Sequence, residues 1–139
     1  MRCIFVIAVT LLMTGCHSAV PDQAALAVIL HSPPHPRLAS CLSISGKDPS
    51  QEVLSALRRV GRRVDAKSTC SEVDWGVVTP AKDRAEFVSI DSFTWVVPWR
   101  ATTELSMHSG PLSGSTWRVK LKRSGDAWVV VSTELVSMS

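Results

Sequence analysis

The clearest pattern in the chain is an alternation of apolar and polar side chains in its second half. Between residues 93 and 105, apolar and aromatic side chains fall mainly on odd positions. The same period of two returns in residues 116–122 and in the valine-rich segment 127–138. Successive side chains of a strand point to opposite faces of a sheet, so this period predicts half-buried strands. We expect Pro98 to mark a bulge, a bend or an edge, because proline cannot donate a hydrogen bond to a strand ladder.

Two segments of the first half have the pattern of helices. Residues 24–30 are apolar throughout and follow Pro21, and proline fits the first turn of a helix because its missing N–H has no partner there. Residues 48–51 form a capping sequence with Asp48 as the expected N-cap. After this cap, apolar side chains recur at helical spacing until Gly61: Val53, Leu54, Leu57 and Val60.

The segments around these helices complete the predicted domain. Three prolines in residues 31–36 predict an extended connector, and residues 41–45 alternate as a short strand does. Residues 64–84 have little periodicity and predict an irregular crossing segment, with room for a short strand near 75–78. The predicted fold class is therefore α+β, with two N-terminal helices packed on a curved antiparallel sheet of three to four strands within residues 23–139.

The order of these elements and the strands from Trp117 to Met138 resemble the sheet of nuclear-transport-factor-2-like domains. In that family, helices cover one face of a bent sheet and often enclose a pocket. The resemblance implies the same arrangement here.

The first fifteen residues differ in character from the predicted domain. Arg2 is followed by an uncharged apolar run of eleven residues, from Cys3 to Met13. As a helix this run would be about 16 Å long, which is roughly half the hydrocarbon thickness of a bilayer. Residues 1–15 therefore predict a removable signal peptide rather than a membrane span. An ordinary secretory signal, in which Cys16 has no special role, is the alternative.

Residues 12–16, Leu-Met-Thr-Gly-Cys, resemble the lipobox of bacterial lipoproteins, with Met13 where that family usually has Leu, Val or Ile. The resemblance implies that Cys16 is acylated, with palmitate among the expected chains, and becomes the new N-terminus. Residues 16–22 would then be a lipidated spacer. His17 is not the Asp that typically signals inner-membrane retention in such lipoproteins. This implies a lipid-anchored protein on the outer membrane, facing the periplasm.

The four cysteines predict one disulfide. Cys3 would leave with the signal peptide and Cys16 would carry the lipid, so Cys41 and Cys70 remain. An oxidising compartment permits these two to pair. Two separate buried thiols are the alternative, and the spacing is not that of a metal site.

Charge and motifs limit the classes of function. Removal of residues 1–15 takes away only Arg2, so the net charge falls from +3 to +2, which is no argument for nucleic-acid binding. The sequence has no P-loop, nucleophile elbow, HExxH motif or dinucleotide turn, so we expect no cofactor and no catalytic residue from a known motif. His31 and His35 are four apart, but Pro33 and Pro34 prevent the helix that a metal site would need.

Two groups of side chains are candidate partner-binding residues. One is the cluster at the end of the second helix, where the helix dipole also favours positive charge: Arg58, Arg59, Arg62 and Arg63. The other combines Trp128 with three basic residues on one face of a strand: Arg118, Lys120 and Lys122. The parity of Trp128 is opposite to that of Val129 and Val131, which predicts an outward indole, with strand-edge packing as the alternative. Three further tryptophans are expected in the core: Trp95, Trp99 and Trp117.

These observations lead to two hypotheses of function. The first is a noncatalytic envelope module that binds another protein, for instance an immunity or inhibitor lipoprotein that acts against a toxin or a wall hydrolase. The second is a small-molecule binder or minor enzyme that uses a pocket between helices and sheet. A deep pocket with converging polar groups would favour the second, and a filled core with an exposed Trp and Arg surface would favour the first.

Overall fold

The computed structural model describes residues 19–110 and 113–139, so the predicted signal peptide and Cys16 lie outside the described residues. In chain order the described elements are α2 (Ala19–His31), β1 (Ala39–Ile44), α3 (Gln51–Arg59), β2 (Val64–Ala66), the short 3-10 helix η1 (Lys67–Thr69), β3 (Ser71–Val73), β4 (Gly76–Val78), β5 (Arg84–Ile90), β6 (Thr94–Val97), β7 (Arg100–Gly110), β8 (Ser113–Ser124) and β9 (Ala127–Met138).

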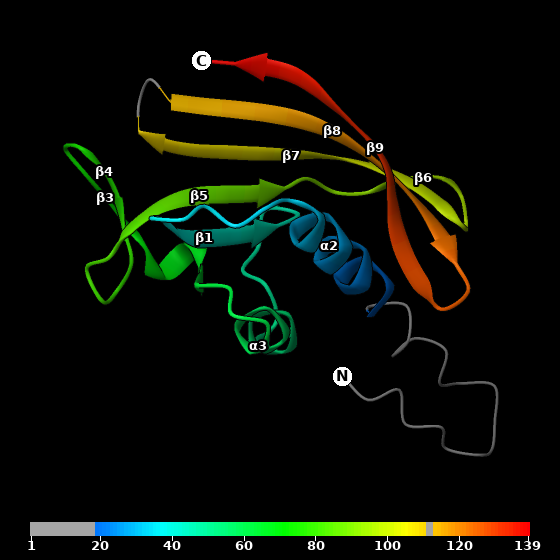
Figure 1. Ribbon diagram of the computed structural model, residues 1–139, viewed down its shortest axis with the longest axis horizontal. Helices are drawn as coiled ribbons and strands as arrows, with labels where there is room; N and C mark the ends of the chain where they lie inside the picture. The colour runs from blue at the N-terminus through cyan, green and yellow to red at the C-terminus, as the bar shows by residue number, and fades with distance from the viewer. Residues whose placement is uncertain (1–18, 111–112) are drawn as a thin grey trace.

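The predicted fold class is wrong in its sheet. The described strands form one nine-stranded mixed sheet with the main order β2-β1-β5-β7-β8-β9 (Figure 1). β1 pairs in parallel with both β2 and β5, while the other pairs are antiparallel. The predicted sheet was purely antiparallel and had three to four strands, whereas the observed sheet has nine strands and contains two parallel pairs. The sheet implied by the resemblance to nuclear-transport-factor-2-like domains is wrong for the same reason, because the observed sheet is mixed and larger.

The parallel strands explain part of this difference. Parallel neighbours need a crossover connection, and α3 lies in the crossover from β1 to β2. Five of the six residues of β1 are buried, so most of this strand lacks the two-residue period of a half-buried strand. β2, β3 and β4 have three residues each, which is too short for any period to show in the sequence.

Both predicted helices are present, with shifted starts. α2 begins at Ala19, so residues 19–22 of the predicted spacer are helical. The N-cap of α3 is Ser50, whose hydroxyl accepts a hydrogen bond from the Val53 N–H at 3.2 Å. Asp48 instead accepts hydrogen bonds from the backbone and the hydroxyl of Ser68, and these lower its pKa. Neither helix in the described part of the chain is long and apolar enough to cross a membrane.

The two faces of the sheet have separate cores. On one face, α2 and α3 bury a large apolar cluster that includes Val28, Leu42, Leu57, Ile90, Val119 and Leu121. On the other face, a small cluster surrounds Cys41, which forms a disulfide with Cys70. The predicted disulfide is therefore confirmed. It closes a loop with a sequence separation of 29, which stabilises the fold by about 3–4 kcal/mol on the chain-entropy model.

β7, β8 and β9 form a long antiparallel arm that bends around α2 (Figure 1). The pairing between β8 and β9 shifts register twice, and each shift leaves one residue of β9 without a partner. These residues are Val131 and Val136. A bulge of this kind bends its strand and increases its twist, which accounts for the curvature of the arm.

Candidate functional site

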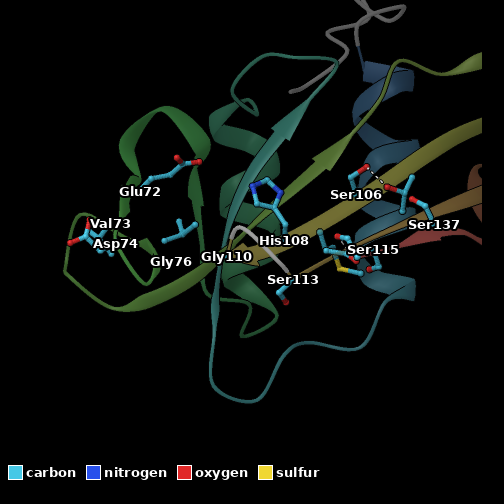
Figure 2. Close-up of a pocket in the computed structure, with 15 residues that line it drawn as sticks. Glu72, Val73, Asp74, Gly76, Ser106, His108, Gly110, Ser113, Ser115 and Ser137 are labelled. Atoms are coloured by element: carbon cyan, nitrogen blue, oxygen red, sulfur yellow. Dashed lines mark hydrogen bonds between the residues drawn. The ribbon is translucent and has the colours of Figure 1, made fainter.

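A cavity of about 510 Å³ lies between the β3–β4 hairpin and the ends of β7, β8 and β9. Figure 2 shows His108 between the hairpin, which carries Glu72 and Asp74, and a group of hydroxyl side chains. The hydroxyl groups belong to Ser106, Ser113, Ser115, Thr116, Ser137 and Ser139. The hairpin approaches β7 closely at Gly76, where a Cβ atom would lie 2.6 Å from the backbone oxygen of Ser109.

Two contacts involve the side chains that line this cavity. The hydroxyls of Ser106 and Thr116 share a hydrogen bond of 3.2 Å, and the His108 ring packs against Phe87 with centroids 5.1 Å apart. Activation of a hydroxyl nucleophile needs a base within hydrogen-bond distance, and His108 makes no such bond among the described residues. The described residues also contain no group of three or more His, Cys, Asp or Glu side chains placed to hold a metal ion.

A second pocket, of about 320 Å³, lies between the end of α2 and the sheet, where the sequence-based alternative places a ligand site. Its lining is mainly apolar, with Leu105, Met107, Trp117 and Val119 from β7 and β8. The Trp117 indole N–H donates to the Ser115 hydroxyl at 3.3 Å and is therefore satisfied within the protein. The pocket is large enough for a small apolar molecule but has few polar groups that could orient one.

Glu86 on β5 is a half-buried carboxyl group. Burial raises its pKa, and His35 of the connector opposes this shift in part. A carboxyl whose pKa is raised in the folded state stabilises the fold at low pH, and this contribution is lost as the pH rises through the raised pKa. Glu86 therefore costs stability when it is ionised.

The predicted arginine cluster is divided between structural and exposed positions. Arg58 donates to the backbone oxygen of Val64 at 2.9 Å and forms an ion pair with Asp65 at 3.3 Å. Arg62 donates to the backbone oxygen of Ser32 at 2.8 Å, just beyond the end of α2. Arg59 and Arg63 are exposed. Two of the four side chains therefore hold α3 to neighbouring segments, and the cluster does not form a single free anion site.

The predicted exposure of Trp128 is wrong. Its side chain is only 8% exposed and lies in the main core, edge-to-face with Trp95 at 5.3 Å between ring centroids. The register places Val130 opposite the buried Leu121, so Trp128 and Val130 face the helices while Val129 faces outward. The partner strand, and not the valine content of β9, determines which parity is buried.

The basic stripe, defined here as Arg118, Lys120 and Lys122, follows the outer face of β8, opposite the helices. This face is polar, as the alternation predicted. Arg118 lies 3.8 Å from a carboxylate oxygen of Glu104 and 3.7 Å from one of Glu134. Lys120 and Lys122 are exposed. Because Trp128 faces the other side of the sheet, it does not form a patch with this stripe.

Trp95 and Trp99 are the exposed tryptophans near Trp128. Trp95 is 40% exposed and Trp99 is 56% exposed, although both were expected in the core. Trp117 packs against the core and is partly buried. We call the exposed apolar residues of β6 and of the turn into β7 the aromatic tip: Trp95, Val96, Pro98 and Trp99. No period in the sequence distinguishes these positions from buried ones, because Trp95 and Trp99 share the parity of the buried Ala101 and Leu105.

A second apolar surface follows β9. We call it the β9 rim, and it consists of the exposed residues Val129, Val131, Leu135, Val136 and Met138. The rim includes both faces of the strand, since Val129 pairs with Lys122 of the outer face and Leu135 pairs with Trp117 of the helix face. β9 pairs only with β8 and is therefore an edge strand of the described sheet. The basic stripe lies on the adjacent strand.

Comparisons of the chain with protein-family models, with curated proteins and with solved structures found no match. The function is therefore argued from the geometry of this molecule.

The two positions Trp128 and Trp99 give a direct test of this assignment. Trp128→Ala should lower the free energy of unfolding by about 3–5 kcal/mol, because it removes a buried aromatic side chain. Trp99→Ala should cost less than about 1 kcal/mol, because that ring is exposed and makes no ring contact within the described residues. Urea denaturation followed by circular dichroism measures both values. Similar losses at the two positions would contradict the burial of Trp128.

Proposed function

We propose that the chain is a lipoprotein of the cell envelope, anchored through acylated Cys16, that acts as a noncatalytic protein-binding module such as an immunity or inhibitor protein. The leader and the lipobox resemblance support the anchor. The disulfide supports an oxidising compartment, because such bonds persist in exported proteins. On the lipobox argument, the domain faces the periplasm from the outer membrane.

The observation that carries the binding role is the β9 rim beside the basic stripe. Exposed apolar side chains along an edge strand, with charged ones on the adjacent strand, have the composition of a protein interface, whose centre is apolar and whose border is polar. The stripe favours a partner with acidic groups, because Lys120 and Lys122 are exposed. A partner could bind an edge strand by adding a strand of its own, but the bulges at Val131 and Val136 interrupt such pairing along β9. We therefore expect the partner to bind through side-chain contacts.

A second candidate function is the binding of a small apolar molecule. The observation in its favour is the 320 Å³ pocket between α2 and the sheet, with Trp117 in its wall. It is second because its wall has few groups that would orient a ligand, whereas the residues of the β9 rim are exposed to a partner.

The anchor is tested by the intact mass of the protein purified from the membrane fraction. We expect the loss of residues 1–15, an added acyl mass on Cys16, and a mass deficit of two hydrogen atoms from the Cys41–Cys70 bond. A protein that keeps Met1 and an unmodified Cys16 would contradict the proposal.

The binding role is tested by photo-crosslinking in living cells. A benzoylphenylalanine side chain in place of Val131 should give a crosslinked adduct of defined mass with one envelope or secreted protein. The same side chain in place of Val60, at the far end of α3, is the matched control, because the two valines are 58% and 62% exposed.

The charge of the basic stripe supplies the second control in the same cells. Lys120→Glu with Lys122→Glu should abolish the Val131 adduct at equal expression, because the stripe then repels acidic groups. Identical adducts from Val131 and Val60, or none from Val131, would contradict a partner at the β9 rim.

A further inference from the structure

We infer that the aromatic tip docks on the anionic surface of the membrane that holds the lipid anchor, so that the domain has one fixed orientation on the bilayer. This inference rests on the proposed acylation of Cys16. It concerns a surface different from the β9 rim.

The tip is a rigid support for exposed rings. The Trp95 ring lies against Phe93, with centroids 5.9 Å apart, and against the buried Trp128. The backbone oxygen of Trp99 accepts a hydrogen bond from the Arg123 N–H at 2.8 Å, which fixes the start of β7 to β8. Both indole rings are nevertheless substantially exposed. Tryptophan is enriched at membrane interfaces, where its apolar ring lies at the level of the headgroups.

The charges beside the tip favour an anionic surface. Arg100 and Lys122 are direct cross-strand neighbours in the pairing of β7 with β8, and like charges in this position repel each other. Arg123 follows immediately and lies on the helix face, as Trp95 and Trp128 do, whereas Arg100 and Lys122 lie on the outer face. All three side chains are exposed at this end of the arm. The turn between β8 and β9 carries one carboxylate, that of Asp126. These three cations therefore outnumber the anion of the turn at this end of the arm. Anionic headgroups would relieve the repulsion between Arg100 and Lys122.

The position of the anchor relative to the tip determines which surface meets the membrane. Ala19, the first residue of α2, is three residues after Cys16, so the two lie within about 10 Å of each other along the chain. The opposite end of α2 contacts the middle of the arm, since His31 and Pro33 line the same pocket as Trp117 and Thr133. Figure 1 shows the first residues of α2 directed to the end of the long axis that carries β6 and the β8–β9 turn.

The start of α2 and the tip therefore lie at the same end of the molecule (Figure 1). A bilayer held three residues before α2 would face the end that carries β6, whereas the β3–β4 hairpin, with Trp75 in its turn, lies at the opposite end. The β9 rim runs along the arm away from the tip, so docking leaves most of it available to a protein partner.

Quenching of tryptophan fluorescence by brominated lipid tests the docking. The protein purified from the membrane fraction is reconstituted in vesicles of phosphatidylcholine and phosphatidylglycerol, with and without bromine on the acyl chains. Bromine quenches only those rings that it contacts. In Trp95→Phe with Trp99→Phe, the quenched fraction should fall by about half or more, since these rings would lie at the interface. Trp75→Phe, which removes an equally exposed ring at the opposite end, should keep the quenching of the parent protein.

Two controls separate the possible causes of a negative result. The melting temperature of each variant reports folding, and Trp99→Phe alone avoids the packing of Trp95 on Trp128. Vesicles of phosphatidylcholine alone should give weaker quenching of the parent protein, and equal quenching would contradict a role for the cations.

The acyl mass on Cys16, measured on the same sample, separates this inference from the proposed function. Acylated Cys16 with equal quenching in all variants would overturn the docking and leave the anchor intact. Unacylated Cys16 would overturn the anchor, and the inference would fall with it.

Discussion

A strand of twelve residues, such as β8 or β9, is about 40 Å long, whereas α2 with its thirteen residues is about 20 Å long. The helix therefore covers only part of the arm, even though the bulges of β9 bend the arm around it. Trp128 belongs to the core cluster that α2 helps to bury. Trp95 and Trp99 remain exposed. The exposure of the aromatic tip follows from this difference in length.

The opposite face of the sheet is stabilised in another way. It has no α-helix in the described part of the chain, only the short 3-10 helix η1, and its small core around Cys41, Phe87 and Val77 is closed by the bond to Cys70. The disulfide holds the segment between α3 and β3 against β1, which an apolar cluster of this size would hold only weakly. The bond that completes this second core persists in oxidising compartments, which supports the proposed export of the chain.

The sequence predicted those features that arise from neighbours along the chain. The period of two in β8 placed Val119 and Leu121 inside and Lys120 and Lys122 outside, and cysteine counting identified the disulfide. Features that depend on pairing between distant strands were not predicted. The parallel pairs of β1 leave no signature in its own residues, and the inner parity of β9 depends on its register with β8, so Trp128 was assigned to the wrong face. Likewise, the roles of Arg58 and Arg62 depend on backbone oxygens that only the fold brings near.

The central claim is that the membrane and a partner cover the two surfaces that the helices leave open. Hydroxyl-radical footprinting of the native protein in its envelope, compared with the unacylated C16S chain in buffer, tests this claim most directly. Trp99 reports the tip, Met138 reports the β9 rim, and Trp75 is an exposed reference outside both. The account predicts several-fold slower oxidation of Trp99 and Met138 in the envelope, with Trp75 unchanged. Unchanged rates at all three positions would contradict it.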